Sequence, residues 1–176
     1  MSNALTLKLM ARGDREIVMT RAFDAPRRLV FDALTRPELI RQWLLGPPGW
    51  TMPVCEIDLK VGGRFRYVWR RTSGEPADCG GEAMREMGMG GVYREIVAPE
   101  RIVHTELFDE DWTSGETLVT SVLTEQAGRT VLTTTVLYAS REAREMVIKS
   151  PMESGVAASY DRLAELLATR AGQEKA

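Results

Sequence analysis

The sequence predicts an α+β fold in which a curved antiparallel sheet wraps around a long C-terminal helix. Three observations lead to this prediction. A series of short β-type segments runs through the middle of the chain, and turn signals separate them. Two short helices come before this series and follow a first strand. The chain then ends in a segment whose apolar residues recur every three or four positions, as on a helix that lies on a sheet.

The first strand and the helix after it are predicted from local residue preferences. Glu16–Phe23 (EIVMTRAF) is a short run of the β type. Asp24 then offers an N-cap, and Pro26 suits the first turn of a helix. We therefore expect a strand followed directly by a helix over residues 26–34.

A second short helix and a turn follow. Thr35 and Glu38 have the spacing of a capping box, which predicts a helix whose last turn carries Trp43. The two prolines in the following GPPG cannot continue the helix, because each lacks a donor N–H and disfavours helical geometry in the residue before it. The chain must therefore turn between Trp43 and Trp50.

The next two strands, residues 51–59 and 63–71, are joined through KVGG and show a clear period of two. In GRFRYVWRR, aromatic residues alternate with arginines, so one face of the strand is aromatic and the other is basic. The aromatic residues are Phe65, Tyr67 and Trp69, and the arginines are Arg64, Arg66 and Arg70. Such an aromatic face is typical of a packed core, and it also fits the wall of a cavity.

The connection over residues 72–88 is longer than usual hairpin loops and is rich in glycine and methionine. Its irregular sequence predicts a mobile flap. Met84, Met87 and the neighbouring Met89 are adaptable apolar side chains that suit a lid, and a plain surface loop is the alternative.

The rest of the chain predicts four more strands and two helices. The strands are residues 91–98, 101–108, 117–125 and 129–138. Ser140 begins a short helix, and SPME at residues 150–153 combines an N-cap, a first-turn proline and a glutamate to start the long terminal helix. The stripe on this helix consists of Met152, Val156, Tyr160, Leu163 and Leu167.

Length and composition limit the function classes. The 176 residues, 44% hydrophobic and 27% charged, suit one globular domain over residues 15–170, with an N-terminal extension over 1–14 and a frayed tail over 171–176. A net charge of −2 gives no basic field for nucleic acid. Because no stretch resembles a membrane span or a signal peptide, we expect a cytoplasmic protein of undetermined oligomeric state.

The sequence also excludes several kinds of site. His104 is the only histidine, so a two-histidine metal site is excluded by count, and DEDWTSGE lacks the ligand pattern of a calcium loop. VGGRF and GMGGVY lack the motifs of phosphate and dinucleotide loops, which indicates strand turns with close backbone approach. Cys55 and Cys79 form no CxxC pair and are expected as free thiols. We therefore expect no metal and no cofactor.

Five stretches carry a resemblance to a known family. They are FDALTRPELIRQWLLGP, VCEIDLKVGGRFRYVWR, GMGGVYREIVAPERIV, GRTVLTTTVLY and MESGVAASYDRLAELLA. In this order they resemble the START-like (SRPBCC) superfamily. Within it, residues 15–168 are similar to bacterial homologues of the C-terminal domain of the activator of the ninety-kilodalton heat-shock protein ATPase. The resemblance implies a helix-grip fold, as in pollen allergens, with a cavity between the sheet and the terminal helix.

Superfamily members bind lipids, sterols and aromatic compounds, and some are cyclases or hydrolases. We therefore expect an intracellular binding module for an apolar or aromatic small molecule or a lipid, with no catalytic residue. The residues expected to contact the ligand are Trp43, Trp50, Phe65, Tyr67, Trp69, Tyr93, His104, Gly155 and Ser159. Tyrosine hydroxyls, Asp58 or His104 would supply the polar contacts.

Several alternatives stay open from the sequence. Trp43 fits plain core packing, and Trp50 fits either a ligand contact or a loop anchor. Gly155 and Ser159 either leave room for a ligand or permit close packing of helix on sheet. His104 in a strand suits a structural role, and an enzyme of the cyclase or hydrolase type would use it or a cavity carboxylate. A co-chaperone-like protein partner is the third alternative.

Overall fold

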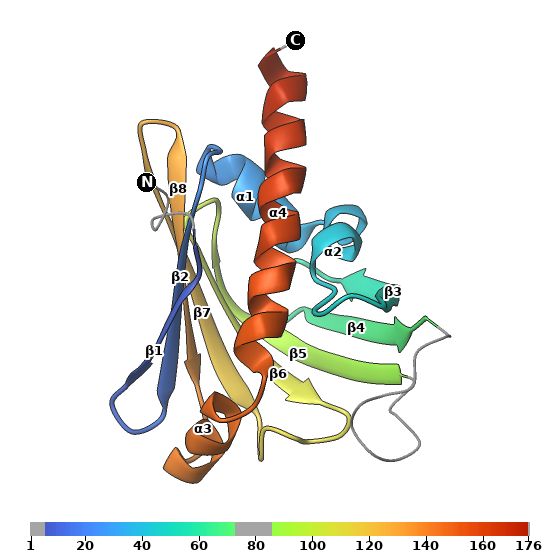
Figure 1. Ribbon diagram of the computed structural model, residues 1–176, viewed down its shortest axis with the longest axis vertical. Helices are drawn as coiled ribbons and strands as arrows, with labels where there is room; N and C mark the ends of the chain where they lie inside the picture. Colours follow the sequence, from blue (N-terminus) through green and yellow to red (C-terminus); the bar gives the residue numbers. More distant parts are fainter. Residues whose placement is uncertain (1–5, 73–85, 176) are drawn as a thin grey trace.

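The computed structural model describes residues 6–72 and 86–175 of the chain. Within these ranges the backbone forms eight strands and four helices (Figure 1). The strands are β1 Lys8–Arg12, β2 Glu16–Phe23, β3 Trp50–Ile57, β4 Arg64–Arg71, β5 Glu86–Val97, β6 Arg101–Phe108, β7 Thr117–Gln126 and β8 Arg129–Leu137. The helices are α1 Arg27–Thr35, α2 Pro37–Trp43, α3 Arg141–Ile148 and α4 Met152–Lys175.

The strands form one sheet in the order β1-β2-β8-β7-β6-β5-β4-β3, and every neighbouring pair is antiparallel. Strands β3 to β8 follow one another as a meander, and β2 pairs with β8. The sheet curves around α4, and α1 and α2 lie beside the upper part of that helix (Figure 1). This arrangement confirms the predicted α+β helix-grip fold.

Strand β1 is the main difference from the expected order of elements. It lies within residues 1–14, which were expected as an extension, and it pairs with β2 from Lys8 opposite Thr20 to Arg12 opposite Glu16. Because most of β1 is exposed, its sequence KLMAR has no alternation of apolar and polar residues that would mark a half-buried strand. The two short helices therefore follow the second strand of the sheet.

The starts of α1 and α2 differ from the predicted caps. The N-cap of α1 is Pro26, and the Asp24 carboxylate instead accepts a hydrogen bond from Arg129 Nε at 2.8 Å. The N-cap of α2 is Arg36, and the buried Thr35 hydroxyl donates to the Phe31 carbonyl of the preceding turn at 2.8 Å. Thr35 is the last residue of α1, so the extended backbone of an N-cap falls one position later, on Arg36.

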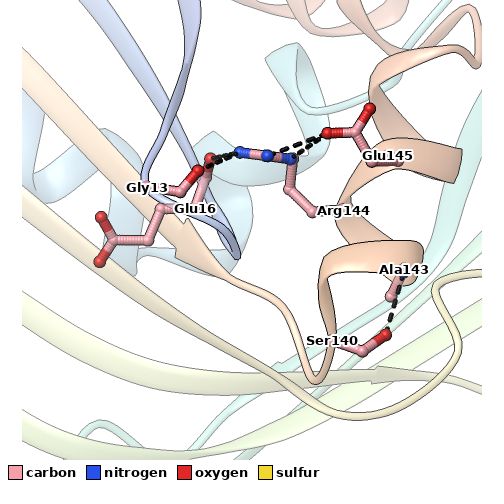
Figure 2. A network of polar contacts seen from close by, with 6 residues as sticks. All are labelled: Gly13, Glu16, Ser140, Ala143, Arg144 and Glu145. Atoms are coloured by element: carbon pink, nitrogen blue, oxygen red, sulfur yellow. Dashed lines mark hydrogen bonds and ion pairs between the residues drawn. The ribbon is translucent and has the colours of Figure 1, made fainter.

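Helix α3 is fixed to the turn between β1 and β2 by a buried arginine. Its predicted N-cap is confirmed, since Ser140 Oγ accepts from the Ala143 N–H at 3.0 Å. The Arg144 guanidinium points away from α3 and donates to the carbonyls of Gly13 and Glu16 at 3.2 and 3.0 Å (Figure 2). Glu145 pairs with the other side of the guanidinium at 2.9 Å.

Helix α4 supplies much of the core. Tyr160, Leu163 and Leu167 of the predicted stripe are buried, while Met152 and Val156 are half-buried. The helix continues to Lys175, so the segment expected as a frayed tail is helical, and Glu174 forms an ion pair with Arg28 of α1. No helix formed by the described residues is long and apolar enough to cross a membrane.

Strand β5 begins earlier than predicted. It starts at Glu86, inside the connection expected over residues 72–88, and Glu86 pairs in register with Arg70 of β4. Thr72, directly after β4, donates from its backbone N–H to the carbonyl of Gly49, directly before β3, at 2.8 Å. This bond extends the pairing of β3 with β4. The remainder of the predicted flap, with Met84 and Cys79, lies outside the described residues.

Candidate ligand-binding pocket

A pocket of about 840 Å³ lies between the concave face of the sheet and α4. Its lining is predominantly apolar and comes from strands β2 to β8, helices α1, α2 and α4, and the loops between them. The volume falls within the range of about 300–1,000 Å³ that is usual for small-molecule sites. The fold therefore leaves a space of ligand size where a compact core would place side chains.

All nine residues predicted to contact a ligand border this pocket. They are Trp43, Trp50, Phe65, Tyr67, Trp69, Tyr93, His104, Gly155 and Ser159. The shared location follows from two periodicities. Alternation places every second residue of β4 and β6 on the concave face, and Gly155 and Ser159 are four residues apart on one face of α4.

Aromatic side chains of β4 and β5 form one wall. Phe65 lies 4.9 Å from Tyr67 and 5.5 Å from Tyr93, measured between ring centroids, and Tyr67 meets Trp69 edge-on at 5.9 Å. All four side chains are buried. The predicted alternation is confirmed, because Arg64, Arg66 and Arg70 are more exposed than the aromatic residues between them and point to the opposite face. Aromatic rings that pack against one another in this way form a rigid apolar surface.

Two tryptophans fix the helices and the following loop to the sheet. The indole N–H of Trp43 donates to the Ala33 carbonyl of α1 at 2.8 Å, and the ring is 3% exposed. The indole N–H of Trp69 donates to the Leu44 carbonyl at 2.6 Å. Trp43 therefore packs as part of the core while also bordering the pocket. Trp50 is half-buried at the start of β3, with the Arg71 guanidinium 5.9 Å above its ring.

The GPPG turn is held against α4 at Gly46. The Gly46 N–H donates to Ser159 Oγ at 2.8 Å, and its carbonyl accepts from the Arg162 guanidinium at 2.7 Å. Gly46 has a φ of 66°, which glycine adopts without strain. A Cβ atom at Gly155 would lie 3.5 Å from Pro47, so the first turns of α4 also approach this loop closely.

Exposed lining residues mark where the pocket opens to solvent. Pro47 after α2, Trp112 between β6 and β7, and Pro151 and Ser154 at the start of α4 are all exposed and all border the pocket. The opening therefore lies between these three segments. Trp112 packs against Phe108 with a centroid distance of 5.4 Å, so one side of the opening is aromatic.

A histidine and a glutamate on β6 supply the most polar part of the lining. His104 Nε2 lies 3.0 Å from Glu106 Oε1, and both side chains border the pocket. His104 Nδ1 is buried and has no hydrogen-bond partner among the described residues. The sequence analysis did not include Glu106, although its spacing of two from His104 places both on the concave face. Asp58, expected as a polar contact, is exposed beside Lys60 and does not border the pocket.

The tyrosine hydroxyls stay neutral inside the pocket. Burial raises the pKa of Tyr93 to about 12. The pKa of Tyr67 is raised well above its ordinary value, first by burial and then by the charge of Tyr93 beside it. Tyr160, whose pKa burial also raises, lies 3.5 Å from the Thr134 hydroxyl. These groups can donate or accept hydrogen bonds without adding charge.

Metal and thiol chemistry find no support in the described part of the chain. Residues 6–72 and 86–175 contain no group of three His, Cys, Asp or Glu side chains placed to hold a metal ion. Cys55 is buried as a free thiol, and burial raises its pKa to about 11. A thiol of this kind is unreactive at neutral pH. The remaining chemistry is that of an apolar cavity with one acid–base pair.

Comparisons with known proteins agree with the fold and the sequence motifs. The family model described as Activator of Hsp90 ATPase homolog 1-like protein matches residues 24–168 of the chain. None of the curated proteins matches it. Among solved structures, a protein from Rhodobacter sphaeroides is 32% identical with a TM-score of 0.82, and the alignment covers 93% of this chain and 99% of that one.

Two further solved structures share the fold at lower identity. A protein from Mycobacterium smegmatis is 21% identical with a TM-score of 0.76, over 94% of this chain and 99% of that one. The AHSA1-like protein from Aeromonas hydrophila is 16% identical with a TM-score of 0.63, over 85% of this chain and 93% of that one. The helix-grip architecture is therefore common to relatives with little sequence identity.

Proposed function

Because this chain belongs to the family of Activator of Hsp90 ATPase homolog 1-like proteins, we propose that it is a binding module whose pocket holds an apolar or aromatic small molecule. The family has the START-like fold of binding modules. The observation that carries the proposal is the pocket of about 840 Å³ with its aromatic wall. Ordinary protein cores are densely packed and contain few voids larger than a water molecule. Filling an apolar space of this size with an apolar molecule therefore lowers the free energy of the system.

A titration followed by backbone amide NMR tests this proposal. The panel contains long-chain alcohols, sterols, flavonoids and polycyclic aromatics. Binding in the pocket predicts saturable shifts on β4, at Trp50 and in the first turns of α4, with little change on the exposed arginine face of β4. A panel without saturable shifts at these positions would contradict the proposal.

Two glycines of α4 provide a matched pair of variants for the same test. Gly155 borders the pocket, and a Cβ atom there would lie in ordinary contact with Pro47 at 3.5 Å, whereas a Cβ atom at Gly172, near the end of the same helix, would have no neighbour within 4 Å. Replacing either glycine by leucine stabilises the helix by about 0.5–1 kcal/mol. We expect Gly155→Leu to weaken ligand binding at least about tenfold by filling the opening, and Gly172→Leu to leave binding unchanged.

The hydrogen-bonded pair of His104 and Glu106 favours a second candidate function, an acid–base hydrolase acting on a ligand in the same pocket. A series of p-nitrophenyl esters with increasing acyl length tests it. Turnover that exceeds free imidazole and is lost in a folded His104→Gln variant would support catalysis. Ester hydrolysis equal to the buffer rate would count against it and leave the binding function standing.

A further inference from the structure

Glu106 is placed where a ligand would meet it. Four alternate residues of β6, namely Ile102, His104, Glu106 and Phe108, all border the pocket, so the carboxylate projects from the sheet toward α4. Its side chain is 26% exposed. Oε1 faces His104 at 3.0 Å, and Oε2 has no hydrogen-bond partner within residues 6–72 and 86–175. One carboxylate oxygen is therefore available to a molecule in the pocket.

The pocket has no fixed positive charge to balance this carboxylate. Among the described residues that border it, Glu106 is the single acidic side chain, and none is lysine or arginine. A ligand with its own carboxylate would place two negative charges in a largely apolar space, which is unfavourable.

The groups around Glu106 suit a cation. Phe65 lies 5.3 Å from His104 and 4.9 Å from Tyr67, so aromatic faces adjoin the carboxylate-bearing strand. Tyr138 also borders the pocket, and burial followed by the charge of Glu106 raises the pKa of its hydroxyl. A carboxylate beside aromatic rings is an arrangement that attracts ammonium groups by charge and by cation–π contact.

We infer that the pocket selects amines, that is, molecules with an apolar or aromatic body and a protonated amino group that Glu106 binds. This inference rests on the proposed binding function and adds the chemical class of the ligand. The aromatic wall would hold the body, and Glu106 Oε2 would accept the ammonium hydrogen bond.

Three probes with the same ring and nearly equal length test the inference: naphthylethylamine, naphthylethanol and naphthylacetic acid. Calorimetric titration gives their affinities for the wild-type protein and for two variants. Glu106→Gln removes the pocket carboxylate, and Glu110→Gln removes an exposed carboxylate from the loop after the same strand. Circular dichroism checks that both variants are folded.

We expect the amine to bind at least about tenfold more tightly than the alcohol, and the acid to bind most weakly, as expected for a charge-assisted hydrogen bond. In Glu106→Gln the preference for the amine should fall to within about threefold, whereas Glu110→Gln should keep it. An acid or an alcohol that binds as tightly as the amine, or an amine preference that survives Glu106→Gln, would overturn the inference while leaving the binding function intact. Binding of none of the three would overturn both.

Discussion

Trp43 combines packing and hydrogen bonding in one side chain. The ring is buried beside Tyr160, 6.0 Å away between centroids, and its N–H is satisfied by the Ala33 carbonyl. The exposed Trp112 at the opening of the pocket contacts the Phe108 ring, but its indole N–H has no hydrogen-bond partner among the described residues. We therefore expect Trp43 to contribute more to the stability of the fold than Trp112 does.

Replacing Trp43 by phenylalanine tests this difference. The variant loses the hydrogen bond, leaves a buried carbonyl without its partner and opens a small cavity, so we expect a loss of about 2–4 kcal/mol in the free energy of unfolding. Trp112→Phe, the control, should change stability by less than about 0.5 kcal/mol. Urea denaturation measures both values. Equal losses in the two variants would show that the Trp43 N–H has no special role.

The residues of the candidate site were predictable to different degrees. Phe65 and Tyr67 could be assigned to one face because a period of two is a local property of the sequence. Glu106 has no such marker, since an inward carboxylate on a strand looks like any other charged residue until the sheet is assembled. Arg162 reaches Gly46 across 116 positions of the chain, and no local pattern encodes that contact.

Gly91 allows β5 to lie very close to the backbone of β6. A Cβ atom at Gly91 would overlap the Thr105 carbonyl of β6 and press on Phe65, whereas at Gly90 the nearest atom would be the Phe65 carbonyl oxygen at 3.2 Å. The pairing of β5 with β6 also shifts register just after this point, between Tyr93 and Glu95. The close backbone approach predicted from GMGGVY is present at Gly91.

We therefore expect Gly91→Ala to lower the free energy of unfolding by about 3 kcal/mol, because the overlapping backbone cannot move without disturbing the sheet. Gly90→Ala, one position away on the same strand, should cost clearly less. Thermal denaturation of both variants provides the measurement. A Gly91→Ala protein as stable as Gly90→Ala would mean that the two strands adjust easily.

Helix α3 depends on Arg144 in a similar way. In Arg144→Met the carbonyls of Gly13 and Glu16 lose their charged donor, so we expect a loss of about 2 kcal/mol. Arg141→Met removes an exposed charge from the same helix and should stay within about 0.5 kcal/mol of wild type. Hydrogen exchange at the β1–β2 turn provides a local readout. Unchanged protection there in Arg144→Met would contradict the anchoring role.

The sequence predicted where the helices and strands lie more accurately than it predicted their first and last residues. Apolar periodicity predicted β4 and α4 because burial of one face repeats along the chain, and β-type residue preferences predicted β2. The predicted caps at Asp24 and Thr35 were wrong, because Asp24 accepts a hydrogen bond from Arg129 and Thr35 is still part of α1, which a capping pattern cannot reveal. Strand β1 has almost no buried face, so periodicity could not mark it.

At the scale of the whole molecule, every tyrosine of the chain is buried with a raised pKa. These are Tyr67, Tyr93, Tyr138 and Tyr160, and burial is the first cause in each. In the unfolded chain they would ionise near about pH 10. The contribution of the neutral tyrosines to the free energy of unfolding is therefore fully present below that pH. It falls as the pH rises toward the pKa values of the folded protein, by up to about 1.4 kcal/mol per tyrosine and pH unit.

Urea denaturation at increasing pH measures this alkaline loss of stability. Tyr138→Phe removes one of the four ionisable hydroxyls and should lose less stability between about pH 8 and about pH 11 than the wild type does. The near-ultraviolet absorbance of tyrosinate should rise only as the protein unfolds. Tyrosinate absorbance that develops near about pH 10 in the folded protein would disprove the raised pKa values.

The attachment of Gly46 to α4 also has a kinetic consequence. Its N–H and carbonyl are both bound by the helix, through Ser159 and Arg162, and the adjacent Pro47 borders the opening. We expect a bulky ligand to enter and leave more slowly while both bonds hold this loop at the opening. Ser159→Ala removes one of them, so it should shorten the residence time of such a ligand more than it weakens equilibrium binding.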